Sequence, residues 1–349
     1  MADLPNLSDR RPWPTPEDAP DAALPLVRSA LDSAAPEAAA SDASHAPPRC
    51  AFTVDLEDWF HGLELSPDRW SGLEARAVAV TGRLLDMLAA HRARATFFVL
   101  GRIAEAHPEL VQRILAAGHE IGSHGNEHQF VYRQSPDAFA RDLDRSLTAL
   151  QRAGAPTVTT YRAPYFSVTE RSLWALERLA AAGITLDSSI MPAPNPRYGI
   201  RSAPLGPHQI ATPSGSLLEL PVSCLELPQV PGILGQPPLR VPFAGGFYLR
   251  FFPLALTRAA IRHTLRQGRP VVFYIHPWEL DPEQPRVRLP SRVAATRYYR
   301  LGSTARKLTA LLREFRWSTL SEVARSYELS EVTARLNPAL VRDAGRLHT

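Results

Sequence analysis

Short apolar runs and longer amphipathic runs alternate along most of the chain. The apolar runs are rich in β-branched and aromatic residues, which favour strands, and strands buried on both faces are apolar throughout. The pattern predicts seven strands, at residues 51–55, 95–100, 120–123, 158–162, 184–187, 217–221 and 271–276.

The amphipathic runs between these strands predict helices. In residues 77–90, Val80, Leu84, Leu85 and Leu88 recur at helical spacing. Several of these runs end at a glycine, the residue that most easily adopts the left-handed conformation after a helix. The other predicted helices are at residues 109–117, 136–153, 170–182, 254–266 and 304–314, and the apolar segment W-S-T-L-S-E-V after the last of them is expected to help close the fold.

Strict alternation of strands and helices predicts an α/β fold with a parallel sheet inside and helices outside. Seven strands fit an incomplete, TIM-like (β/α)7 barrel better than an open doubly wound sheet. We assign the barrel to residues 49–282, a C-terminal extension packed on it to 283–337, and a tail to 338–349. Residues 1–48 are rich in Pro, Ala, Asp and Ser and predict a disordered tail.

One segment inside the barrel region, residues 225–250, breaks the alternation. It is rich in proline and glycine, and Gly245-Gly246 precede three aromatic residues and an arginine. This pattern predicts either a loop with a binding face or a packed turn, and the sequence does not decide between them.

Composition and charge exclude several classes of function. The chain is 45% hydrophobic and 21% charged, which is typical of a globular protein, and its net charge of +4 includes no basic block that would indicate nucleic-acid binding. Two cysteines exclude a disulfide framework. No signal peptide and no apolar run of membrane-spanning length are visible, so we predict a cytoplasmic protein, with periplasmic action left open. Nothing in the sequence predicts the oligomeric state.

Candidate chemistry lies where the predicted strands end. In a barrel, the active site forms at the carboxyl ends of the strands. Five of the seven predicted strands end in or beside a polar residue, in chain order Asp55, His124, Arg162, Asp187 and His276. These side chains would face one shared mouth of the barrel.

His124 and His128 are the first candidates for a metal site, because their spacing of four brings both imidazoles to one side of a helical turn or tight loop. With one carboxylate from the first strand they form a normal ligand set for a catalytic divalent metal. The period of two in a strand favours Glu57 as that carboxylate, whereas Asp58 would serve if the backbone turned. Both stay open, and three acids in residues 55–58 also fit a solvated turn.

The remaining candidates suit acid–base chemistry. Asp55 is flanked by apolar residues and could act as a base. Arg162 precedes a proline-stiffened loop and could hold a carboxylate ionised, while a backbone N–H near Tyr165 could face an oxyanion. His276 would supply a general acid, and Asp187 could orient His276 or Arg162 or simply cap a loop.

Five motifs, in this order, resemble the signature motifs of the polysaccharide deacetylases, the NodB-homology enzymes of carbohydrate esterase family four. They are T-V-D-L-E-D at 53–58, S-H-G-N-E-H at 123–128, R-A-P-Y-F at 162–166, L-D-S-S at 186–189 and F-Y-I-H-P-W-E at 273–279. The D-x-E-D-W opening and the H-P-W-E close are most similar to the subgroup found with exosortase and exopolysaccharide loci.

The resemblance implies hydrolysis of an N-acetyl amide on an amino sugar, with zinc as the metal and cobalt or nickel as alternatives. By motif position Asp55 would be the base, His124 and His128 metal ligands, Arg162 the residue holding the base, and His276 the acid. Most members carry adjacent acids, whereas Leu56 intervenes here. Relatives with that spacing favour Glu57 as a ligand, and they include hydrolases of cyclic amides.

We therefore predict a metal-dependent deacetylase of an amino-sugar glycan in exopolysaccharide biosynthesis, acting on a glycan or a lipid-linked amino sugar. Two alternatives remain. One is a hydrolase of a small cyclic amide, and the other is a catalytically weak glycan-binding component of an exopolysaccharide assembly system.

Overall fold

The structure is a computed structural model, and it describes residues 49–63, 65, 67–195, 197–227 and 238–327. The predicted N-terminal tail at 1–48 and C-terminal tail at 338–349 lie outside the described residues, as does the last part of the predicted extension. No described helix combines the length and the apolar character needed to cross a membrane.

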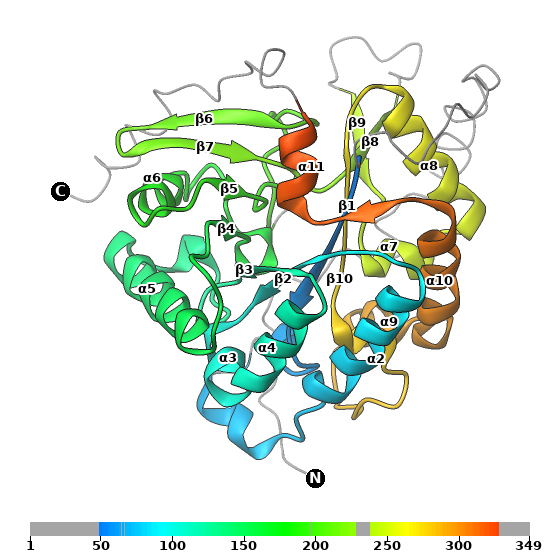
Figure 1. The fold of residues 1–349 in the computed structure, drawn as a ribbon. Coiled ribbons are helices and arrows are strands. Elements are labelled where there is room, and N and C mark those ends of the chain that lie inside the picture. Colours follow the sequence, from blue (N-terminus) through cyan, green and yellow to red (C-terminus); the bar gives the residue numbers. More distant parts are fainter. Residues whose placement is uncertain (1–48, 64, 66, 196, 228–237, 328–349) are drawn as a thin grey trace.

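A nine-stranded sheet forms the centre of the molecule, with strand order β10-β1-β2-β3-β4-β5-β7-β6 and with β11 paired to β1 (Figure 1). All of its pairs are parallel except β6 with β7. Its strands are β1 (Cys50–Leu56), β2 (Thr96–Val99), β3 (Glu120–Ser123), β4 (Thr160–Tyr161), β5 (Leu186–Asp187), β6 (His208–Thr212), β7 (Gly215–Glu219), β10 (Val271–Ile275) and β11 (Trp317–Ser318). The α/β class with a parallel sheet is confirmed.

Each of the seven predicted strands corresponds to one of these elements. The strands that the sequence did not predict are β6, β11 and an antiparallel pair, β8 (Cys224–Leu227) and β9 (Leu239–Pro242). The segment at 225–250 therefore contains regular structure, although its prolines and glycines favour loops. β8 and β9 pair only with each other. They lie outside the strand–helix alternation from which the other strands were predicted.

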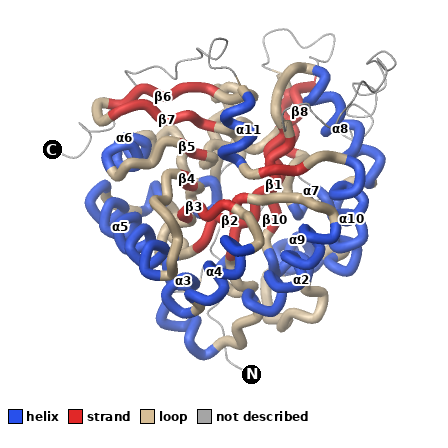
Figure 2. The backbone as a smooth tube through the Cα atoms, in the orientation of Figure 1, coloured by secondary structure: helices blue, strands red, loops and turns tan. Residues whose placement is uncertain are grey.

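Helices pack around the outside of the sheet (Figure 2). They are α2 (Ala77–Ala90), α3 (Gly101–Ala106), α4 (Pro108–Ala116), α5 (Pro136–Arg152), α6 (Trp174–Ala181), α7 (Gly246–Phe251), α8 (Leu254–Arg266), α9 (Ser291–Tyr298), α10 (Thr304–Glu314) and α11 (Leu320–Ser326). α5 shows why they form: Ser135 accepts a hydrogen bond from the Ala138 N–H at its start, and Gly154 follows its end with a positive φ of 96°.

The segment that follows β7 returns to β10, at the other side of the sheet, without pairing with it as a strand in the described residues. Beyond β7 the chain crosses to β10, where the Ser223 N–H donates to the Val272 carbonyl at 3.2 Å. The Val272 N–H in turn donates to Ser223 Oγ at 2.9 Å. One serine thus provides a donor and an acceptor that link the two ends, as expected of an incomplete barrel.

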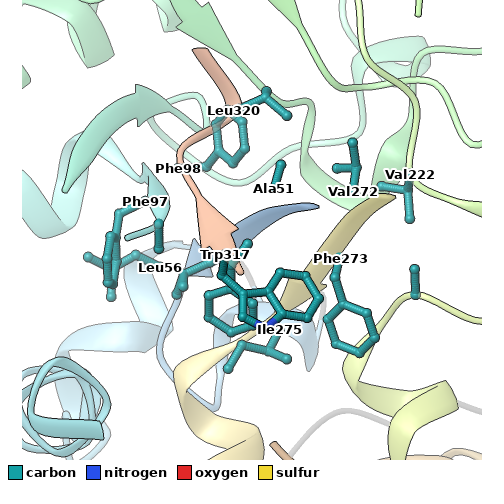
Figure 3. Packing of buried hydrophobic residues seen from close by; sticks show 14 of the residues in the cluster. Ala51, Leu56, Phe97, Phe98, Val222, Val272, Phe273, Ile275, Trp317 and Leu320 are labelled. Atoms are coloured by element: carbon teal, nitrogen blue, oxygen red, sulfur yellow. The ribbon is translucent and has the colours of Figure 1, made fainter. Parts of the chain in front are cut away.

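The main hydrophobic core surrounds β1, whose seven residues are all buried (Figure 3). Phe52 contacts Trp317 of β11 edge-to-face, with ring centroids 5.7 Å apart, and stacks on Phe273 of β10. Fully burying one such side chain contributes roughly 1.5–3 kcal/mol. The C-terminal segment is therefore part of the same core as the barrel.

Helix α11 covers the amino-terminal ends of the strands. The Leu320 N–H donates to Thr96 Oγ1 at 2.7 Å, and the Ser321 N–H donates to Glu120 Oε2 at 3.2 Å. Both acceptors lie at the first residues of β2 and β3. The predicted helix at 304–314 is confirmed. The apolar segment after it packs at the amino-terminal ends of the strands, and the candidate site residues lie at the carboxyl ends.

Candidate active site

The carboxyl ends of the strands share one pocket. Its lining includes Asp55 from β1, Glu57 directly after it, and His276 directly after β10. His128 from the loop after β3 and Tyr165 from the loop after β4 complete that side. The ends of β1, β3, β4 and β10 are thus brought together because parallel strands all end at the same edge, whereas Asp187 at the end of β5 is not among the residues that line the pocket.

Glu57, His124 and His128 form a compact cluster of ligand-type atoms, all within 4.8 Å of one another and all buried. Oε1 of Glu57 lies 2.7 Å from Nε2 of His128 and 3.2 Å from Nε2 of His124. Burial alone would raise the pKa of Glu57, but the neighbouring imidazoles hold it well below its usual range. A carboxylate between two imidazoles is the donor set that divalent metals take.

The hydrogen bonds of His124 fix its ring for such a role. Its Nδ1 lies 2.8 Å from the carbonyl oxygen of Arg162, which can only accept, so Nδ1 carries the proton. The other ring nitrogen, Nε2, faces Oε1 of Glu57, and in a neutral ring its lone pair and the carboxylate oxygen could both bind a cation between them. A carbonyl that orients a ligand histidine is common around bound metals. The residues therefore fit a divalent metal.

Asp58, the alternative ligand, points elsewhere. Its Oδ2 accepts from the N–H groups of Arg76 and Ala77 at 2.8 and 2.9 Å, and its Oδ1 accepts from the Trp59 N–H at 2.9 Å. Its carboxylate thus stabilises the start of α2, where backbone N–H groups lack partners within the helix. The structure brings Glu57, and not Asp58, to the two histidines.

Asp55 is held by Arg162, as the sequence predicted. Nη1 of Arg162 donates to Oδ1 of Asp55 at 2.8 Å and to Thr53 Oγ1 at 2.7 Å, and Nη2 donates to Ser188 Oγ at 2.8 Å. Arg162 is fully buried, and its guanidinium lies 4.4 Å from the centre of the Phe98 ring. An arginine fixed this way holds the aspartate carboxylate in one orientation.

His276 faces the same carboxylates from β10. Its Nε2 lies 4.0 Å from Oδ2 of Asp55 and 3.6 Å from Oε1 of Glu57. Its Nδ1 lies 3.3 Å from Oε2 of Glu279, which also accepts the His276 N–H. Burial alone would lower the pKa of His276, but the carboxylates of Glu57, Glu279 and Asp55 raise it to about 9.

Glu279 is a site residue that the sequence reasoning missed, although it ends the H-P-W-E motif. Its second oxygen accepts from Nη2 of Arg250 at 2.9 Å, and both side chains are buried. A spacing of three from His276, across the short helical turn η5 (Pro277–Leu280), was the available signal. Glu279 thus orients His276 from the side away from Asp55.

Gly245 and Gly246 explain the aromatic loop that the sequence left open. A Cβ on Gly246 would lie 1.7 Å from a carboxylate oxygen of Glu279, and one on Gly245 would lie 2.4 Å from the Tyr274 ring. Both glycines allow α7 to pack directly on the strand that carries His276. The segment is a packed element, and its Phe247 and Tyr248 also line the pocket.

Asp187 lies apart from these groups. It is not among the pocket-lining residues; its Oδ1 accepts from Ser189 Oγ at 2.5 Å, and it pairs with Glu219 across β5 and β7. No hydrogen bond or ion pair joins it to His276 or to Arg162 within the described residues. One reading of the sequence was that Asp187 orients His276. In the structure the carboxylate in contact with the His276 ring at Nδ1 is that of Glu279.

Tyr165 lines the pocket in a left-handed conformation, with φ 57°. Its ring stacks on Phe130 with centroids 4.0 Å apart, and its hydroxyl donates to the His61 carbonyl at 3.0 Å. A non-glycine residue in this region is uncommon and is found where packing over-determines the backbone. The stacking and the hydrogen bond hold Tyr165 in this conformation, and the rigidity that Pro164 predicts for the loop stays a prediction.

Comparison with known proteins divides the chain into two regions. Residues 70–184 match the family model for polysaccharide deacetylase, and residues 188–325 match a domain of unknown function, DUF3473. His124, His128 and Arg162 lie in the first region. His276, Glu279 and Arg250 lie in the second. One pocket is therefore built from both.

Curated relatives match part of the chain. The chain is 34% identical over 99 residues to a peptidoglycan-N-acetylglucosamine deacetylase of Bacillus cereus, a match that covers 28% of this chain and 36% of the relative. It is 40% identical over 73 residues to a chitooligosaccharide deacetylase of Rhizobium leguminosarum bv. trifolii, covering 21% of this chain and 34% of the relative. The chain thus spans about a third of these two relatives.

A solved structure extends the likeness to most of the fold. The crystal structure of a Mycobacterium smegmatis protein assigned to the polysaccharide deacetylases aligns with 86% of this chain and 96% of its own, with a TM-score of 0.57 and 23% identity. At that identity the match establishes the fold. The family model and the curated relatives show that this chain contains a polysaccharide deacetylase domain at residues 70–184, and a DUF3473 region follows it.

Proposed function

We propose that this chain is a metal-dependent hydrolase that removes the acetyl group from an N-acetylated amino sugar of a glycan. The observation that carries the proposal is the convergence of the Glu57, His124 and His128 cluster with Asp55 and His276 on one pocket. The curated relatives, which are deacetylases of peptidoglycan and chitooligosaccharides, support the same chemistry.

A divalent cation held by Glu57, His124 and His128 would polarise the acetamide carbonyl and make water a stronger nucleophile. Asp55 accepts the proton that the attacking water loses, because Arg162 holds its Oδ1 and leaves its Oδ2 facing His276 across the pocket. His276 donates a proton to the departing nitrogen. The amide C–N bond breaks, a C–O bond forms, and the products are acetate and a free amino sugar.

The tighter assignments follow from the resemblance. We expect zinc as the resident metal and a role in exopolysaccharide biosynthesis, because the D-x-E-D-W and H-P-W-E motifs are those of the subgroup found at such loci. Elemental analysis of the purified protein tests the metal. Loss of the exopolysaccharide's free amino groups in a deletion strain tests the pathway.

Acetate release from N-acetylhexosamine oligomers, with metal restored, tests the activity. We expect wild-type protein to release acetate, and Asp55→Asn or His124→Ala to lower kcat/KM by at least about a hundredfold, in the range of removing a general base. Leu239→Gln, an exposed change far along the chain, serves as the matched control. Full activity in either site variant would refute the residue assignment, and no acetate from any glycan would refute the function.

A further inference from the structure

Arg297, on α9, carries a charge that the proposed reaction does not use. Its side chain lines the pocket, and only 7% of the residue is exposed. Within the described residues it makes no ion pair, and its Nε and Nη2 have no hydrogen-bond partner. Its guanidinium lies 4.5 Å from the centre of the Trp278 ring. A buried guanidinium with two unpaired donors is costly and rare, so a missing partner is its simplest explanation.

The other arginines beside the site already have partners. Arg162 is paired with Asp55 at 2.8 Å, and Arg250 is paired with Glu279 at 2.9 Å. Each pair joins one positive to one negative charge at hydrogen-bonding distance. Arg297 is therefore the surplus cation among the arginines of the described pocket.

Arg297 lies close to the proposed metal cluster. Its Nη1 would be 3.4 Å from a Cβ placed on Gly62, and Oε2 of Glu57 would be 4.0 Å from the same point. Glu57 attracts Arg297, but its Oε1 already contacts two imidazoles, and a bound divalent cation would neutralise it further. The absence of a side chain at Gly62 leaves space between the guanidinium and the reacting groups.

Arg250 fixes the backbone that carries Arg297. Nη1 of Arg250 donates to the carbonyl oxygens of Thr296, Arg297 and Tyr299 at 3.1, 3.0 and 2.8 Å. Because Arg250 also holds Glu279, the same side chain positions α9 and the residue that orients His276. The Arg297 guanidinium is thus preorganised relative to the proposed acid, which is what a substrate-anchoring group requires.

We propose that Arg297 is an anion-binding subsite, and that the substrate carries an oxyanion, a carboxylate or a phosphate, on the amino sugar that is deacetylated or on the unit beside it. This rests on the proposed function. The Nε and Nη2 donors of a guanidinium form a planar fork that matches two oxygens of either anion, which an ammonium or a neutral amide does not. Trp278 supports the guanidinium plane on one face.

Binding measurements test the subsite without turnover. Calorimetry with the Asp55→Asn protein, with and without metal, compares N-acetylglucosamine with N-acetylmuramic acid and N-acetylglucosamine 1-phosphate. We expect at least one acidic sugar to bind about tenfold or more tightly than the neutral one. Adding Arg297→Gln should remove most of that difference, since charge-assisted pairs are of this strength. The acidic sugar that binds more tightly shows whether the subsite takes a carboxylate or a phosphate.

Two further variants keep the test decisive. Arg300→Gln removes an exposed arginine three residues away and should leave the preference unchanged. Arg297→Lys keeps the charge without the fork and should retain only part of the preference; it also decides the matter if Arg297→Gln does not fold, as judged by circular dichroism. Equal binding of acidic and neutral sugars by wild-type and variant would overturn the proposal.

The outcomes for subsite and function are separable. An anion preference that depends on Arg297, without acetate release from any glycan, would uphold the subsite and refute the deacetylase. Acetate release at equal kcat/KM from neutral and acidic substrates, lowered equally by Arg297→Gln, would do the reverse.

Discussion

At the scale of single residues, the acids after β1 show how backbone direction divides chemically equal groups. Asp55 points to Arg162, Glu57 to two histidines, and Asp58 to the start of α2. Asp55 and Glu57 are two apart, so the pleat of the strand sends both to the pocket side. Asp58 follows the end of the strand, where the chain turns, and its carboxylate accepts backbone N–H groups instead.

Replacing the two candidate ligands separately distinguishes these roles. Glu57→Ala should abolish stoichiometric metal binding, measured by elemental analysis after dialysis. Asp58→Ala should keep the metal but lower the free energy of unfolding by about 2 kcal/mol, since a buried carboxylate that caps a helix is lost. Chemical denaturation measures the second effect. Metal loss in Asp58→Ala with retention in Glu57→Ala would reverse the assignment.

At the scale of elements, α7, η5 and α9 are linked to one another next to His276. Arg250 joins all three, and the chain's only lysine, Lys307 of α10, donates to the carbonyl oxygens of Leu249, Arg250 and Phe252 at the end of α7. A cation at a helix carboxyl end stabilises otherwise unpaired carbonyls. The position of the proposed acid thus depends on how closely α7 approaches β10.

Gly246→Ala tests that dependence. The added Cβ would lie 1.7 Å from Glu279, whose carboxylate cannot move without losing Arg250 or His276. We expect a loss of about 1–3 kcal/mol in stability from overpacking and a lower kcat with unchanged metal content.

Gly302→Ala is the matched control, because nothing lies within 4 Å of its Cβ position. Its stability and kcat should stay close to wild type. A Gly246→Ala protein with wild-type kcat would show that the contact between α7 and Glu279 does not position His276.

At the scale of the whole molecule, two matched regions form one sheet and one pocket. β5 lies between the two matched regions and β7 belongs to the second, and their pairing places Asp187 opposite Glu219 in the interior. Each has one buried oxygen without a partner in the described residues, and two buried carboxyls side by side do not both ionise readily, so we expect them to share a proton. Burial raises the pKa of Asp187 to about 6 and that of Glu219 well above its usual range.

This pair predicts a pH-dependent stability. A carboxyl whose pKa is raised by folding stabilises the fold most below its unfolded pKa, near 4, and that contribution is lost as the pH rises through the folded value. Glu219→Gln supplies an amide donor to Asp187 in place of the shared proton. We expect the variant to lose less stability than wild type between about pH 4 and pH 8.

Thermal unfolding across that range measures the difference, and 1 kcal/mol corresponds to roughly 1–2 °C in a chain of this size. Glu283→Gln removes an exposed carboxylate and should follow the wild-type curve. If Glu219→Gln and wild type lose stability in parallel, the two carboxyls do not share a proton.

The seven parallel strands, most helices that flank them and the residues at the strand ends were predictable from the sequence. The period of the apolar positions carries that information locally, and the parallel arrangement places all carboxyl ends together. His124, His128, Arg162, Asp55 and His276 could therefore be proposed before their contacts were known. The strands at 224–227 and 239–242 could not be predicted, because they form by pairing with each other and their own sequences favour loops.

Only the tertiary structure decided which neighbour each side chain meets. Spacing left Glu57 and Asp58 open, left Asp187 between orienting a site residue and capping a loop, and missed Glu279. It gave no reason to single out Arg297, which is 240 residues from Glu57 in the chain. A local pattern fixes the face from which a side chain emerges, whereas its partner depends on the packing of distant elements. For this protein the sequence determined the strand ends, and the packing of α7 and α9 determined the pocket they form.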